Sequence, residues 1–207
     1  MYNYIIFDVD GTILDTEKAV LNSLQQTLKE EGRQYKLGNL RFALGIPGKE
    51  TLNRLNIPEV DRVHSKWAQL ETEYSKDATL FPDLETVIDH LGKRKIKLGI
   101  VTSKTKQGMV DTFDPLGLSS YFEEMITADD TTKHKPHPEP LLSCMERLNA
   151  PPSKTIYIGD SIYDMQSAKA AGIKFGLALW GAKTTEKFDS ADYIFKQPID
   201  IIDWIQT

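Results

Sequence analysis

Residues 4–12 read YIIFDVDGT, in which the apolar run from Tyr4 to Phe7 ends directly at Asp8. A continuous apolar run of this kind is typical of a strand that is buried on both faces in a parallel sheet. Because residues i and i+2 of an extended segment point to the same side, Asp8 and Asp10 can face one small volume. Taken alone, the pair is equally compatible with a turn, since Asp-Gly is a common turn signal.

Similar apolar runs recur along the chain and alternate with helical patterns. The further strands predicted in this way are Leu98–Val101, Met125–Thr127, Ile156–Ile158, Phe175–Leu179 and Tyr193–Phe195. Apolar residues spaced at i, i+3, i+4 and i+7 over 84–91 predict a helix, and weaker patterns predict helices near 165–172 and 198–205. This alternation predicts an α/β fold with a Rossmann-like parallel sheet and helices on both of its faces.

Residues 15–80 break the alternation, because they hold helical patterns and no convincing strand. Helices are predicted near 20–28, 49–55 and 60–74, while residues 44–50 contain two glycines and a proline and predict a loop. We therefore expect two domains. Residues 1–15 and 81–207 would form the α/β core, and residues 16–80 a small helical cap domain inserted after the first strand.

The composition excludes several classes of protein. The 207 residues carry 25 basic and 30 acidic side chains, a net charge of −5, and the whole acidic excess lies outside residues 15–80, which disfavours a general nucleic-acid-binding surface. The longest apolar stretch, Phe175–Ala182, is far shorter than the ~20 residues of a membrane span. Cys144 is the only cysteine, which excludes an internal disulfide and favours the cytoplasm. We expect a monomer or homodimer acting on a small molecule.

Four polar clusters follow four of the predicted strands, and ligands of open parallel sheets bind at the carboxyl ends of the strands. The clusters are Asp8–Thr12, Thr102–Lys104, His134–Pro136 and Gly159–Asp164. If they converge, they gather the carboxylates of Asp8, Asp10, Asp160 and Asp164, which would repel one another unless a cation were present. Oxygen ligands of this kind suit Mg²⁺.

Basic and hydroxyl groups accompany these carboxylates. Beside a metal ion, the Lys135 ammonium and the Thr102 hydroxyl could hold a phosphoryl group. Gly11 has no side chain, so backbone N–H groups next to it could approach an anion closely. The clusters therefore favour phosphoryl chemistry.

The motifs resemble those of a known family. DVDGTILDT at 8–16, IVTSK at 100–104, KPHPEP at 135–140 and IGDSIYD at 158–164 are similar, in this order, to the four motifs of the haloacid dehalogenase (HAD) superfamily of phosphatases. The likeness includes the helical cap after the first motif, and it is strongest to phosphoglycolate-phosphatase-like members.

The resemblance implies a role for each matching residue. Asp8 would be the nucleophile that forms an aspartyl-phosphate, and Asp10 the general acid and then the general base. Thr102 would bind the phosphoryl oxygens, and Lys135 would stabilise both Asp8 and the transferring group. The implied Mg²⁺ ligands are Asp8, the backbone carbonyl of Asp10, and Asp160, with Asp164 in a supporting role.

We expect Gly11, Thr12, Ser103 and Lys49 to bind the substrate. Ser103 departs from the asparagine that is frequent in related sequences after the second-motif threonine, which weakens the assignment of a substrate more than that of the reaction. In the cap, Lys49 or Arg41 could meet a second anionic group of a small phosphorylated metabolite.

Three alternatives to a phosphomonoester hydrolase remain open. A sugar-phosphate mutase and an inorganic pyrophosphatase of the same superfamily would share the core motifs. A signalling receiver module, a different class of protein, would also use a phosphorylated aspartate, a lysine and Mg²⁺. Asp10 and the inserted cap favour an enzyme over the receiver.

Overall fold

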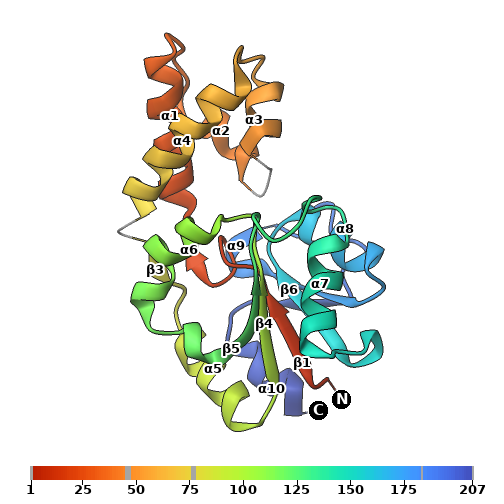
Figure 1. Ribbon diagram of the computed structural model, residues 1–207. Coiled ribbons are helices and arrows are strands. Elements are labelled where there is room, and N and C mark those ends of the chain that lie inside the picture. The colour runs from red at the N-terminus through yellow and green to blue at the C-terminus, as the bar shows by residue number, and fades with distance from the viewer. Residues whose placement is uncertain (1, 45–47, 76–77, 183, 207) are drawn as a thin grey trace. The chain divides into compact units, whose positions relative to one another are not determined.

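The computed structural model describes residues 2–44, 48–75, 78–182 and 184–206 and divides the chain into two compact units (Figure 1). One unit comprises residues 1–15 and 80–207, and the other comprises residues 16–79. Among the described residues, no helix combines the length and the apolar character that a membrane crossing requires.

The first unit is built on a six-stranded sheet in the order β5-β4-β1-β6-β7-β8. Its strands are β1 (Tyr4–Phe7), β4 (Lys97–Val101), β5 (Phe122–Ile126), β6 (Thr155–Gly159), β7 (Lys174–Ala178) and β8 (Tyr193–Phe195). Every neighbouring pair is parallel. The predicted α/β class with a Rossmann-like parallel sheet is thus confirmed, and the central strands β4, β1 and β6 end side by side.

Helices cover both faces of this sheet, because alternate side chains of each strand point to opposite sides. On one face, Ile5 and Phe7 of β1 pack with α5 (Leu84–Lys93) and α10 (Asp200–Gln206). On the other, Ile6 and Tyr157 pack with α7 (Glu139–Leu148) and α8 (Ile162–Ala170). The side chains of Ile5, Ile6, Phe7 and Tyr157 are fully buried.

The predicted elements of this unit differ from the observed ones only at their ends. Residue 127 lies outside β5, and residue 179 begins α9 (Leu179–Ala182) rather than ending β7. The structure adds α6 (Lys106–Thr112) and short 3₁₀ turns at Asp114–Leu116, Ser119–Tyr121 and Pro152–Lys154. A separate two-stranded sheet pairs β2 (Leu14–Asp15) with β3 (Thr79–Leu80).

The second unit is helical, as its sequence predicts. It contains α1 (Glu17–Glu30), α2 (Leu37–Leu40), the 3₁₀ turn Arg41–Ala43, α3 (Gly48–Arg54) and α4 (Val60–Tyr74). Leu24, Leu28 and Trp67 belong to its own hydrophobic core, where Trp67 Nε1 donates a hydrogen bond to Ser23 Oγ. Residues 45–47 of the predicted loop at 44–50 lie outside the described residues. The interpretation of this unit as a cap stays a prediction.

Candidate active site

Lys135 brings together side chains that follow different strands. Its buried Nζ lies 2.8 Å from Asp8 Oδ1, just beyond β1, and 2.7 Å from Asp164 Oδ1, in α8 beyond β6. Nζ also lies 3.2 Å from the hydroxyl of Tyr157 in β6. Lys135 itself does not follow its strand directly, because it lies in the loop between β5 and α7. Three of the four polar clusters thus meet around one ammonium group.

Asp164 is held in place by the start of its own helix. Ser161 is the N-cap of α8, and the Ser161 side chain and the Asp164 side chain each bond the backbone N–H of the other residue, a capping box. Asp164 Oδ2 accepts from Ser161 N at 3.0 Å and from Ser161 Oγ at 2.6 Å. Its other oxygen, Oδ1, accepts from Lys135. Both oxygens of this carboxylate therefore have donors within the protein.

A divalent cation fits the acidic cluster formed by Asp8, Asp160 and Asp164. One carboxylate oxygen from each lies within 4.8 Å of the others. Lys135 pairs with Asp8 and Asp164, so with all three carboxyls ionised the cluster has an excess of two negative charges. Carboxylate oxygens are the donors that Mg²⁺ prefers. Because both Asp164 oxygens already accept hydrogen bonds, Asp8 and Asp160 are better placed to serve as direct ligands.

The electrostatics of the site show the cost of gathering these charges. Burial, opposed by Lys135 and reinforced by Asp164, raises the pKa of Asp8 from its ordinary 3.8 to about 7. Burial and the carboxylates of Asp164 and Asp8 also raise the pKa of Asp160 well above its ordinary value. Burial alone would lower the pKa of Lys135, but the two carboxylates raise it, so the ammonium stays charged. The cluster thus favours binding a cation or protons.

Asp10 lies next to a second lysine. Lys104 Nζ, on a side chain that is 9% exposed, is 3.0 Å from Asp10 Oδ1, and the Asp10 side chain is 29% exposed. The contact is a close ion pair without the alignment of a hydrogen bond, since Oδ1 is buried and has no hydrogen-bond donor. Asp10 therefore faces a cation of its own, distinct from Lys135.

The loop after β1 fits closely against the fourth cluster. Gly11 has φ +78°, and a Cβ placed there would lie 2.2 Å from Asp160 Oδ2, so this position requires glycine on both counts. Thr12 is buried, and its hydroxyl donates to Asp160 Oδ1 at 3.3 Å. The structure therefore brings the first and fourth clusters into direct contact.

The remaining predicted residues differ in their exposure. Thr102 is buried at the carboxyl end of β4, where its Oγ1 accepts from Lys104 N at 3.1 Å, whereas Ser103 is exposed. Lys49 lies in the helical unit, 60% exposed and 2.6 Å from Asp61 Oδ1. Arg41, in the same unit, pairs with Glu17. Substrate contacts of Lys49 and Arg41 stay predictions.

Comparison with known proteins places this geometry in a family. A sequence model described as haloacid dehalogenase-like hydrolase matches residues 5–178, which include all four motifs. The chain belongs to this family. The HAD assignment made from the four motifs is thereby confirmed, together with its class of hydrolase.

Named relatives of this HAD protein act on different phosphates. It is 32% identical to pyrophosphatase PpaX of Oceanobacillus iheyensis, over 96% of this chain and 94% of the relative. It is 30% identical to a phosphoglycolate phosphatase of Aquifex aeolicus, with the same coverage of 96% and 94%. The chain is therefore about as similar in sequence to a pyrophosphatase as to a phosphoglycolate phosphatase, the class that the motifs predicted.

Solved structures agree on the fold. A Lactobacillus plantarum protein provisionally named a phosphoglycolate phosphatase superposes with a TM-score of 0.93 at 27% identity, covering 98% of this chain and 99% of the other. CbbY of Rhodobacter sphaeroides, crystallised with phosphate, gives a TM-score of 0.83 at 20% identity, covering 97% and 96% of the two chains. At that identity the second likeness shows the fold alone.

The HAD site contains residues that sequence reasoning missed. Tyr157 was part of an apolar run, and Trp180, whose Nε1 donates to the Thr12 carbonyl at 2.9 Å, lies outside the four motifs. Gly181 follows in α9, where a Cβ would lie 1.7 Å from the Gly11 carbonyl oxygen. The signal for Lys104 was present, since it directly follows the second-motif Thr-Ser pair.

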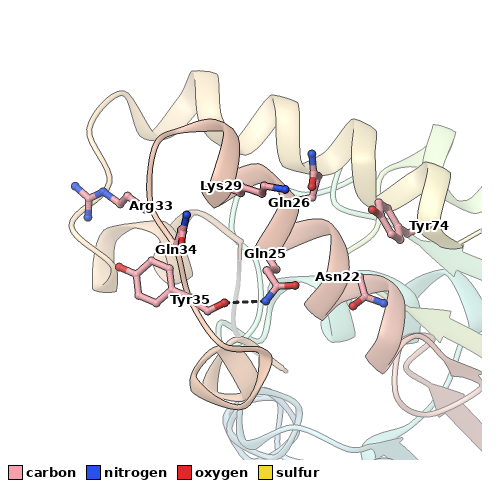
Figure 2. Close-up of a pocket in the computed structure, with 8 residues that line it drawn as sticks. All are labelled: Asn22, Gln25, Gln26, Lys29, Arg33, Gln34, Tyr35 and Tyr74. Atoms are coloured by element: carbon pink, nitrogen blue, oxygen red, sulfur yellow. Dashed lines mark hydrogen bonds between the residues drawn. The ribbon is translucent and has the colours of Figure 1, made fainter.

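The helical unit has a polar pocket of its own, of about 430 Å³ (Figure 2). It is lined by Asn22, Gln25, Gln26, Lys29, Arg33, Gln34, Tyr35 and Tyr74. Gln25 Nε2 crosses it to donate to the Tyr35 carbonyl at 2.7 Å, and Arg33 donates to the carbonyls of Leu55 and Asn56. These bonds tie the loop after α1 to its neighbours, and no predicted site residue lines the pocket.

Proposed function

We propose that this HAD hydrolase is a Mg²⁺-dependent phosphatase that hydrolyses a small phosphorylated metabolite through a phosphorylated Asp8. The observation that carries the proposal is the buried contact of Lys135 with Asp8 at 2.8 Å, within an acidic cluster that also holds Asp160 and Asp164. A nucleophilic carboxylate, a fixed cation and a metal-binding set of oxygens are what phosphoryl transfer requires.

In the first step, an Asp8 carboxylate oxygen attacks phosphorus, and the bond from phosphorus to the leaving oxygen breaks. The ammonium of Lys135 contacts Oδ1 of Asp8 and can neutralise charge on the phosphoryl group during transfer. Thr102, at the end of the neighbouring strand β4, can donate its hydroxyl proton to a phosphoryl oxygen. Backbone N–H groups around Gly11 and the exposed Ser103 could supply further donors.

Asp10 is the general acid and then the general base in this proposal. It protonates the leaving oxygen in the first step and takes a proton from the water that attacks phosphorus in the second, which restores the Asp8 carboxylate. Lys104, at 3.0 Å, holds the Asp10 carboxylate in the resting protein. An arriving substrate anion would compete for this ammonium and so release Asp10 from the ion pair.

Mg²⁺ would be held by Asp8, the Asp10 carbonyl and Asp160, with Asp164 supporting the site through Lys135. When bound, the ion would supply positive charge to the phosphoryl oxygens. Thr12 would then orient Asp160 through their hydrogen bond of 3.3 Å rather than contact the substrate itself.

Inorganic pyrophosphate is a second candidate substrate, favoured by one specific observation. Lys104 places a cation beside Asp10, on the side from which the leaving group is protonated, so a leaving group that carries negative charge would gain an ion pair. Phosphate is such a leaving group, and glycolate is another. The identity of 32% with a pyrophosphatase and of 30% with a phosphoglycolate phosphatase supports the same class of substrates.

The test is phosphate release from purified protein with and without Mg²⁺. The substrates are p-nitrophenyl phosphate, pyrophosphate, phosphoglycolate and a hexose phosphate. Turnover that requires Mg²⁺ and a phosphorylated Asp8 peptide after acid quenching would support the proposal. A phosphorylated protein that persists for minutes without turnover would indicate a signalling module, and transfer of phosphate between sugar positions would indicate a mutase.

A further inference from the structure

Tyr157 places a polar group inside a fully buried strand. Its side chain has no exposed surface and lies on the face of the sheet that α7 and α8 cover. The neighbours of Tyr157 in β6, Ile156 and Ile158, are apolar and equally buried. Burying a hydroxyl costs free energy unless it has hydrogen-bond partners. The contacts of the Tyr157 hydroxyl therefore explain how a tyrosine can occupy this position.

The hydroxyl has three partners, each from a different part of the site. Tyr157 Oη lies 3.2 Å from Lys135 Nζ, 3.0 Å from Asp164 Oδ1 and 2.9 Å from the carbonyl oxygen of Val101. A phenol has one proton to donate and lone pairs with which to accept. Since Lys135 can only donate, Oη accepts from Lys135 and donates to the Val101 carbonyl or to Asp164.

Tyr157 thereby completes the coordination of the ammonium. Lys135 carries three N–H groups, and the structure gives Nζ three acceptors, namely Asp8 Oδ1, Asp164 Oδ1 and Tyr157 Oη. If the third acceptor of Lys135 were also a carboxylate, it would add a negative charge to a site that already holds Asp8, Asp160 and Asp164, whereas the phenol adds none. The position of the ammonium is therefore fixed by three contacts at no further electrostatic cost.

We propose that Tyr157 is a positioning residue of the phosphoryl-transfer site, which holds the Lys135 ammonium against Asp8 and links it to the end of β4. The inference rests on the proposed function, because it assigns Lys135 to the reaction. Val101 directly precedes Thr102, so one hydroxyl connects β4, β6 and, through Lys135, Asp8 after β1. Tyr157 touches no substrate in this arrangement.

The Tyr157 hydroxyl is expected to affect the phosphoryl-transfer step more than substrate binding. During transfer, Lys135 must face both the attacking Asp8 and the phosphoryl oxygens, and a small displacement of a fixed donor reduces the rate strongly. Substrate binding depends on other donors as well. Removing the hydroxyl should therefore lower kcat and leave KM nearly unchanged.

The experiment compares Tyr157→Phe with Tyr193→Phe. Tyr193 is a control of the same residue type, since its hydroxyl also bonds a side chain, the partly buried Tyr2 Oη at 3.1 Å, but lies in the edge strand β8. With p-nitrophenyl phosphate and Mg²⁺, we expect kcat of Tyr157→Phe to fall about tenfold or more, the effect of losing a hydrogen bond to a charged group, and KM to change less than about twofold. Tyr193→Phe should keep both constants.

The second readout is the ¹⁵N resonance of the Lys135 ammonium, assigned by its loss in Lys135→Met. Its chemical shift should change, and its hydrogens should exchange faster with water, in Tyr157→Phe but not in Tyr193→Phe. An unchanged resonance, or a kcat within about twofold of wild type, would overturn the proposal. If Tyr157→Phe does not fold, an NOE between the Tyr157 hydroxyl and the Lys135 ammonium in the wild-type protein decides the question.

The two readouts separate this inference from the proposed function. If the wild-type protein hydrolyses no phosphate, the proposed function fails, while the ammonium resonance still reports whether Tyr157 holds Lys135. If turnover is normal and the resonance does not respond to the loss of the hydroxyl, only the role of Tyr157 is wrong.

Discussion

Replacing Asp8 by asparagine is expected to abolish turnover and, at the same time, to stabilise the metal-free protein. Asparagine keeps the shape of the side chain and an oxygen that can accept from Lys135, but it carries no charge. The loss of turnover follows from the loss of the proposed nucleophile. The gain in stability follows from the electrostatics of the buried cluster.

The magnitude comes from the pKa of Asp8. Burial and the nearby carboxylate of Asp164 raise that pKa to about 7 although Lys135 lowers it. The folded protein therefore disfavours the ionised form. The pKa rises from its ordinary 3.8, and each pKa unit corresponds to about 1.4 kcal/mol. Ionisation of Asp8 therefore destabilises the folded protein by at most about 4 kcal/mol.

The sign of the pH dependence follows by linkage. Because the folded-state pKa lies above the unfolded value, the stabilisation from proton binding at Asp8 is fully present below about pH 4 and is lost as the pH rises through about 7. Asparagine does not titrate, so the stability of Asp8→Asn does not fall with rising pH on account of this position. The variant should thus exceed wild type in stability near pH 8, and the difference should shrink toward about pH 5.

The assay is urea unfolding of wild type and Asp8→Asn with a chelator, at both pH values. Asp189→Asn, in which an exposed aspartate of the same unit is replaced, should stay within about 0.5 kcal/mol of wild type. If Asp8→Asn is less stable than wild type near pH 8 without metal, the ion pair with Lys135 outweighs burial and repulsion, and the reasoning is wrong. Retention of about a tenth of wild-type turnover would contradict the nucleophile.

Three further changes test other contacts of the site. Replacing Lys135 by methionine leaves two buried carboxylates without their cation, so urea unfolding at neutral pH should show a loss of about 3 to 5 kcal/mol. Replacing Lys104 by methionine should raise the KM for pyrophosphate about tenfold, and that for p-nitrophenyl phosphate by less than about twofold, in steady-state kinetics. Replacing Gly11 by alanine should push Asp160 aside, and a Mg²⁺ titration should show half-maximal activity at a higher concentration; an unchanged midpoint would contradict the close approach.

Much of the fold was predictable because its signals are local. Continuous apolar runs predicted the strands, and helical spacing predicted α5 over 84–91, since both patterns depend on which side chains neighbours along the chain can bury together. The ends of elements were less accurate. Residue 179 was expected in a strand and begins α9, because apolar composition alone does not mark where a strand ends.

The candidate site was predictable to the extent that its residues follow strands. Asp8 and Asp160 directly follow β1 and β6, which neighbour each other in the sheet, so their convergence follows from the strand order of a parallel fold. The contact of Lys135 with Asp8 was expected from the family motifs rather than from spacing, since the lysine lies in a long loop after β5.

The sequence by itself determined the alternation of strands and helices, the order of the four motifs and the chemistry of their side chains. Only the tertiary structure decided that the Tyr157 hydroxyl reaches Lys135 and that Lys104 lies 3.0 Å from Asp10. Local pattern places Tyr157 in a buried strand and on one face of it. Which group a buried hydroxyl meets depends on the packing of segments far apart in the chain, and no local periodicity records that.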